Sequence, residues 1–120
     1  MTFKVQVVTA TESGEEVVRD VACVERHDLT PASLGLAIAD SKAILQGLQE
    51  VVVAWQMRTY LDTQRQCPHC DKLRQSKGGH HTVFRTVFGD LPVESPRFTH
   101  CPCQEQDTAS FSPLAALLPV

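Results

Sequence analysis

The first hydrophobic pattern along the chain has a period of two. Apolar and polar residues alternate from Phe3 to Thr9 (FKVQVVT), and a second valine-rich stretch runs from Val17 to Glu25 (VVRDVACVE). A polar segment, Glu12–Glu15 (ESGE), separates them. This pattern predicts a β-hairpin with one covered face. Because a two-stranded hairpin is only marginally stable in water, we expect another part of the chain or a second copy to cover it.

The next pattern has the period of a helix. Thr30-Pro31 is typical of a helix start, with a hydroxyl as the cap and proline at the first helical position. Helical composition then continues to about residue 64, and Gly35 and Gly47 are its weakest points. We therefore expect either one bent helix, or a short helix over Pro31–Ala39 followed by a long one over Asp40–Thr63.

The long helix is amphipathic. Its apolar residues recur at steps of three and four and form one stripe: Ile44, Leu45, Leu48, Val51, Val52 and Trp55. We expect this stripe to cover the N-terminal hairpin. The alternative is a helix pair between two subunits of a homodimer.

A second strand pair is predicted near the C-terminus. His80–Phe88 (HHTVFRTVF) and Leu91–Phe98 (LPVESPRF) flank a Gly89-Asp90 turn. Pro92 and Pro96 lack the amide hydrogen that a strand donates, so we expect the return strand to be short and at an edge. The aromatic residues of this hairpin are expected to form its small core: Phe84, Phe88 and Phe98.

Two cysteine pairs flank this hairpin. Cys67-Pro68-His69-Cys70 precedes it and Cys101-Pro102-Cys103 follows it. Two close cysteine pairs joined by a hairpin predict a zinc ribbon, because Zn²⁺ prefers four thiolate or imidazole ligands in a tetrahedron. The predicted ligands are Cys67, Cys70, Cys101 and Cys103. The second pair is one residue tighter than the usual spacing, and His100 is the alternative fourth ligand.

Other interpretations of these residues remain open. Cys67–Cys70 also resembles a thiol oxidoreductase site, but such a site follows a strand and opens a helix, whereas this one follows a helix. Structural disulfides do not suit a reducing compartment. His69 and the pair His80-His81 are weaker candidates for ligands. Cys23 is interpreted as a small buried apolar residue.

These elements predict an α+β fold of modest size. The 120 residues form one domain or two very small ones. We expect a hairpin and helical region over 1–64, a zinc-ribbon-like region over 65–104 and a linker with an apolar tail over 105–120. The tail, Phe111–Val120 (FSPLAALLPV), either begins a further segment or docks back on the core. With no apolar run that spans a bilayer and no signal peptide, we expect a cytoplasmic protein without a membrane partner.

Charge is distributed unevenly. The formal net charge is -3, which argues against a protein whose whole surface binds nucleic acid. Residues 1–57 hold four Lys/Arg and eight Asp/Glu, whereas residues 58–100 hold seven and four. The basic excess therefore falls on the predicted ribbon and on the segment that precedes it. Its members are the candidate nucleic-acid-binding residues: Arg58, Arg65, Lys72, Arg74, Lys77, Arg85 and Arg97.

Several motifs together resemble the N-terminal region of the ISKra group of insertion-sequence transposases. The resemblance covers most of the chain from about residue 30 onward. The matching segments are Leu34–Leu45 (LGLAIADSKAIL) with Leu48-Gln49, Cys67–Cys70 (CPHC), Lys77–His80 (KGGH), Thr86–Val93 (TVFGDLPV), Ser95–Phe98 (SPRF), Cys101–Cys103 (CPC) and Phe111–Leu114 (FSPL).

The resemblance implies a bacterial mobile-element protein whose metal-binding N-terminal part helps to recognise the DNA ends of the element. In that family a nuclease-like catalytic domain follows. No segment after Cys103 supplies its βαβ core, so no catalytic residue is carried over, and we expect neither enzymatic activity nor a small-molecule substrate. Two hypotheses remain: a zinc-containing DNA-binding module, or a protein-interaction and oligomerisation module in which zinc is only structural.

Overall fold

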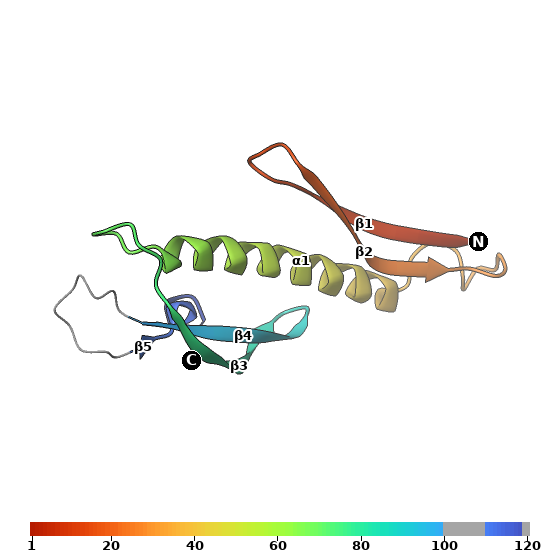
Figure 1. The fold of residues 1–120 in the computed structure, drawn as a ribbon. Helices are drawn as coiled ribbons and strands as arrows, with labels where there is room; N and C mark the ends of the chain where they lie inside the picture. Colours follow the sequence, from red (N-terminus) through yellow and green to blue (C-terminus); the bar gives the residue numbers. More distant parts are fainter. Residues whose placement is uncertain (100–109, 119–120) are drawn as a thin grey trace. The chain divides into compact units, whose positions relative to one another are not determined.

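The computed structural model describes residues 1–99 and 110–118 (Figure 1). The fold is α+β, as predicted: a two-stranded antiparallel hairpin, one long helix and a C-terminal three-stranded sheet. The chain divides into two compact units, Met1–Val53 and Ala54–Val120. The helix α1, Ile38–Arg65, contributes residues to both.

The N-terminal hairpin is confirmed. Strand β1, Thr2–Ala10, pairs with β2, Glu16–Glu25, in an antiparallel register that sets Phe3 opposite Val24. The tight turn between the strands contains Gly14 at a φ of +86°, a conformation that residues with a Cβ rarely adopt. The side chain of Cys23 is exposed, so its interpretation as a buried residue was wrong. Alternation along β2 instead buries the neighbouring side chain, Val24, which is 5% exposed.

The helix begins later than predicted. Thr30-Pro31 opens a turn rather than a helix, because the Ser33 amide donates to the Thr30 carbonyl at 3.1 Å and Gly35 follows at a φ of +75°. The start of α1 is stabilised by Asp40, whose carboxylate accepts the Ala37 amide at 2.8 Å. The predicted long helix is therefore right, and the predicted short one is wrong.

Gly47 does not interrupt α1. It is the point at which the helix approaches β2, since a Cβ built on Gly47 would lie 2.5 Å from the Val21 carbonyl oxygen. The helix thus packs against the hairpin at Gly47. Of the two roles expected for the helix, covering the hairpin or pairing two subunits, this contact agrees with the first. The stripe is only partly covered: Val51 is 3% exposed, but Leu45 and Leu48 remain 39% and 38% exposed.

The C-terminal sheet has the order β3-β4-β5 and is antiparallel. Strand β3 is Ser76–Thr86, β4 is Gly89–Thr99 and β5 is Ser110–Phe111. The hairpin is confirmed, but its turn lies at residues 87–88, not at Gly89-Asp90. Thr86 closes it, since its hydroxyl accepts the Phe88 amide at 3.1 Å and donates to the Gly89 carbonyl at 2.7 Å.

The return strand was predicted to be short and at an edge, and both expectations are wrong. β4 has 11 residues and lies between β3 and β5. Pro92 and Pro96 are four residues apart on β4, so the two nitrogens that lack a hydrogen face the same side of the strand. On the edge of β4 that does not pair with β3, the two residues of β5 pair with Phe98 and Thr99.

The core of this unit differs from the predicted aromatic set. Phe98 is buried at 4% exposure, whereas Phe84 is half-buried and Phe88 is 41% exposed. Leucine and valine supply much of the rest, since Leu91, Val93 and Leu114 are also buried in the described part of the sheet and tail, together with Pro113. The tail docks back: the short helix η1, Pro113–Ala116, packs on β4 and buries Leu114 completely.

In the part of the chain that the structure describes, no helix is long and apolar enough to cross a membrane.

Candidate metal centre

Cys67 and Cys70 lie in a narrow turn directly after α1. The Cys67 amide donates to the Lys72 carbonyl at 2.9 Å, and the Asp71 amide donates to the Cys67 carbonyl at 3.0 Å. The Arg74 amide then bonds the Arg65 carbonyl at 2.7 Å, which returns the chain to the end of the helix. Both cysteines are therefore presented by one hydrogen-bonded loop.

Asp71 makes the sharp reversal of this turn. Its φ is +60°, in the left-handed region where Asp and Asn are tolerated better than other residues with a Cβ. The Gln66 side chain supports the reversal by donating to the Asp71 carbonyl at 3.3 Å. Within the turn Cys67 is completely buried and Cys70 is half-buried. Two cysteines three residues apart have the spacing typical of one ligand pair of a tetrahedral zinc site.

The other predicted ligands, Cys101 and Cys103, lie outside the described residues, as does His100. Among residues 1–99 and 110–118, no three His, Cys, Asp or Glu side chains gather in a way that would hold a metal ion. The described part thus contributes two candidate ligands. His69 and the pair His80-His81 are exposed.

The sheet brings the chain back toward the cysteine turn. At the end of β4, the Thr99 amide and hydroxyl both donate to the Gln75 carbonyl, at 2.9 and 3.3 Å. Gln75 lies five residues after Cys70, and Cys101 lies two residues after Thr99. Two residues of extended chain reach at most about 7 Å. The chain therefore enters and leaves the β3–β4 hairpin side by side, at Gln75 and Thr99.

Arg74 has a structural environment that the sequence did not reveal. Its guanidinium donates to the Gln64 carbonyl at 2.8 Å and lies 4.9 Å from the centre of the Phe111 ring. It therefore joins the end of α1 to β5. The charge pattern of the sequence grouped Arg74 with the candidate phosphate contacts. Nothing in the neighbouring sequence indicates that its side chain contacts Gln64 and Phe111.

The other six candidate nucleic-acid-binding residues are exposed: Arg58, Arg65, Lys72, Lys77, Arg85 and Arg97. Within the described residues, none of them has a carboxylate within 4.0 Å. Arg58 lies over the Trp55 ring, 5.6 Å from its centre. The register of β3 and β4 sets Arg85 opposite Asp90, and Lys77 lies at an irregularity in the pairing.

Comparisons of the chain with protein-family models, with curated proteins and with solved structures found no match. Any functional assignment therefore depends on the chemistry of the cysteine turn and the charged surface.

Proposed function

We propose that the chain is a zinc-binding module that contacts DNA, without catalytic activity of its own, and that it corresponds to the N-terminal region of an ISKra-type transposase. The observation that carries the proposal is the cysteine turn. Cys67 is buried and Cys70 half-buried on a loop that backbone hydrogen bonds close, and a β-hairpin follows them, as in a zinc ribbon.

Zinc in this position would have a structural role. Cys67, Cys70, Cys101 and Cys103 would hold it as thiolates and leave no open coordination position for a substrate. A ligand set that must be deprotonated couples metal affinity to pH, and metal binding then adds to the folding free energy of a small unit.

Two features support DNA as the partner. Six exposed cationic side chains belong to the same compact unit as the cysteine turn. Among the described residues none of them forms an ion pair within 4.0 Å, so their charge is available for phosphate oxygens. Contacts of this kind position a protein on DNA without reading its sequence.

The proposal is tested by the metal content of the purified protein. We expect one Zn²⁺ per chain, lost in Cys67→Ser and in Cys101→Ser, with Cys23→Ser as the control that retains it. Retention in Cys101→Ser together with loss in His100→Ala would assign the fourth position to the histidine. A protein that folds identically without metal would refute the zinc proposal.

The second candidate function is an interaction or oligomerisation module. It is favoured by the exposed part of the α1 stripe, where Leu45, Leu48 and Val52 are 38–39% exposed. If this stripe pairs subunits, Leu48→Asp converts a dimer to a monomer in sedimentation. A monomer before and after the change excludes the pairing.

A further inference from the structure

The base of the cysteine turn is a short antiparallel ladder. The Arg74 amide donates to the Arg65 carbonyl at 2.7 Å, and Gln66 forms an antiparallel bridge with Leu73. Cys67 directly follows Gln66, so its backbone is placed by this ladder. When the ladder is closed, it fixes the segment from which both thiols of the turn project.

The C-terminal tail, residues 110–118, contacts this base through Arg74. The Arg74 guanidinium donates to the Gln64 carbonyl at 2.8 Å and lies 4.9 Å from the centre of the Phe111 ring. One side chain thus extends from the end of α1 to β5. The tail contains no Cys, His, Asp or Glu, so it supplies no metal ligand of its own.

The tail is docked on β4 by apolar burial and by one hydrogen bond. The rings of Phe98 and Phe111 meet edge to face with their centres 6.4 Å apart, and Leu114 is completely buried. The hydroxyls of Ser95 and Ser112 share a hydrogen bond of 2.9 Å, and Ser95 is 2% exposed. A two-residue strand and a four-residue helix have little stability of their own, so these contacts decide whether the tail is docked.

A second connection joins the tail to the same base. Thr99 donates twice to the Gln75 carbonyl, and Ser110 of the tail pairs with Thr99. Gln75 directly follows Arg74. Two adjacent residues that close the cysteine turn are therefore attached to β4 and to the tail. Docking of the tail and closure of the turn support each other through these residues.

We propose that docking of the tail regulates metal retention at the cysteine turn: the docked tail raises the affinity for zinc, and bound zinc stabilises docking. This inference rests on the proposed function, because it takes Cys67 and Cys70 as zinc ligands. Two equilibria that share one structural element change each other by the same factor. We expect a factor of about ten, so a change that undocks the tail loosens the metal without altering a ligand.

The zinc affinity of the full chain, measured by competition with a chromophoric chelator, tests the effect of the tail on the metal. Leu114→Asp places a charge at a completely buried position and undocks the tail, so the Kd for zinc should rise about tenfold. Leu117→Asp is the matched control. Leu117 lies in the same tail but is 50% exposed, so the Kd should stay within about twofold of the native value.

Phe111→Leu is a milder change that does not depend on undocking. It keeps an apolar side chain in β5 but removes the ring beside Arg74, and the Kd should rise about threefold. The absorption spectrum of the Co²⁺-loaded protein reports the ligand set. At saturation it should be the same in the native chain, Leu114→Asp and Phe111→Leu, and it should change in Cys67→Ser.

Hydrogen exchange tests the effect of the metal on the tail. The amides of Leu117 and Leu118 both donate to the Leu114 carbonyl at 2.9 Å, so they are protected when the tail helix is formed. Zinc should raise their protection by the same factor of about ten, because linkage is reciprocal. The Phe88 amide, at the other end of the β3–β4 hairpin, is the reference and should not change. In Cys67→Ser zinc should have no effect on the tail.

Three results would overturn this inference and leave the zinc site standing. They are an equal Kd for Leu114→Asp and Leu117→Asp, tail protection that does not respond to zinc, and a Co²⁺ spectrum that Leu114→Asp alters. A native chain that binds no metal would instead refute the zinc proposal and this inference with it. The measurements thus distinguish failure of the linkage from failure of the proposed function.

Discussion

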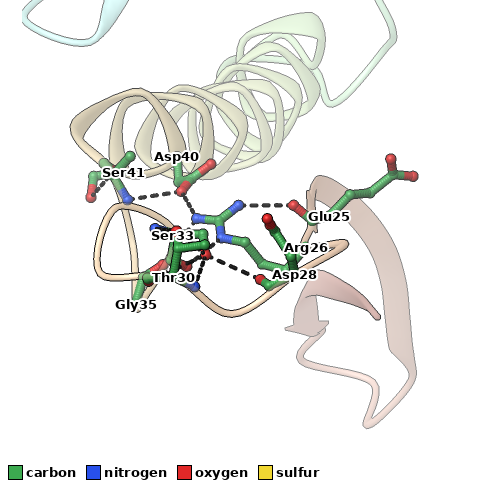
Figure 2. Close-up of polar contacts among 9 residues, drawn as sticks. Glu25, Arg26, Asp28, Thr30, Ser33, Gly35, Asp40 and Ser41 are labelled. Carbon is green, nitrogen blue, oxygen red and sulfur yellow. Dashed lines mark hydrogen bonds and ion pairs between the residues drawn. The ribbon is translucent and has the colours of Figure 1, made fainter.

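Asp40 shows how one carboxylate organises the start of α1. The Arg26 guanidinium pairs with this carboxylate at 2.5 Å and donates to the Ser33 and Gly35 carbonyls, at 3.1 and 2.9 Å (Figure 2). The Ala37 amide, followed by the Arg26 guanidinium, holds the pKa of Asp40 below its ordinary value, although desolvation opposes the shift. Both contacts favour the charged form of the side chain. Protonation of Asp40 therefore weakens the helix start and the loop that Arg26 secures.

The sign of this shift predicts an acid-dependent loss of stability. Asp40 contributes fully above its ordinary pKa of 3.8, and its contribution disappears as the pH falls through the lower folded value. Asp40→Asn should melt below the native protein at pH 7, and this difference should shrink as the pH is lowered below 3.8. The helical circular dichroism signal measures it. Glu50→Gln, an exposed helical carboxylate, is the control. A melting difference that stays constant with pH would contradict the prediction.

Arg74 is a second residue whose role depends on contacts distant in sequence. Arg74→Met keeps the apolar stem but removes the hydrogen bond to Gln64 and the interaction with the Phe111 ring. We expect a loss of about 1–2 kcal/mol in the free energy of unfolding of the C-terminal unit. Denaturant titration followed by fluorescence of Trp55, the single tryptophan, measures it. Lys72→Met, at an exposed position in the same loop, should change the stability by less than about 0.5 kcal/mol. Equal effects of the two changes would show that Arg74 is not a structural residue.

At the scale of elements, hydrophobic periodicity correctly predicted the helices and strands that depend on residues close together in the sequence. The two hairpins and the long helix follow from alternation and from helical spacing, and all three are confirmed. The errors arose where distant contacts decide the outcome. Thr30-Pro31 looked like a helix start, but Ser33 and Gly35 turn the chain, and the cap comes from Asp40 with help from Arg26 on the preceding segment.

The C-terminal sheet shows the same limit. Nothing near Pro92 indicated that β5 would pair beside Thr99 and make β4 a central strand. The cysteine turn was more predictable, because two cysteines at that spacing need only a local reversal. The sequence placed the reversal between Cys67 and Cys70, but it carried no signal for the left-handed conformation of Asp71.

Gly47 provides a prediction about the packing of α1 on β2. In an exposed helix, Gly→Ala stabilises by about 1 kcal/mol. Here the added methyl group would lie 2.5 Å from the Val21 carbonyl oxygen and 2.8 Å from its Cβ, so the helix and the strand would have to separate. Gly47→Ala should therefore lower the melting temperature in spite of its helix propensity. Lys42→Ala, at an exposed position of the same helix, is the control for propensity. A higher melting temperature for Gly47→Ala would show that the hairpin does not contact the helix at this point.

At the scale of the whole molecule, charge separates the two units. Met1–Val53 holds four basic and eight acidic residues, and Ala54–Val120 holds seven and six. The net negative charge thus comes from the N-terminal unit. Since charges interact weakly beyond a Debye length of about 10 Å, binding to DNA depends on local groups of cations more than on the net charge.

The salt dependence of DNA binding tests this view of the molecule. With Arg74 held in structural contacts, six exposed cations remain, and we expect three or four of them to reach phosphates. The logarithm of the binding constant should then fall with the logarithm of the salt concentration with a slope of about -3. Fluorescence anisotropy with duplex and single-stranded oligonucleotides, with zinc present, measures this slope.

Charge reversal identifies the unit that binds. Lys72→Glu with Lys77→Glu should flatten the slope by about two and weaken binding to all DNA sequences alike, because contacts to phosphate carry no sequence information. Lys42→Glu is the matched control, since it reverses an exposed lysine of the N-terminal unit and should leave the slope unchanged. Arg85→Ala should alter sequence preference only if its side chain reaches a base edge. If no binding is observed at low salt with zinc present, or if Lys42→Glu flattens the slope as much as the double change does, the cations around the cysteine turn are not the DNA-binding surface.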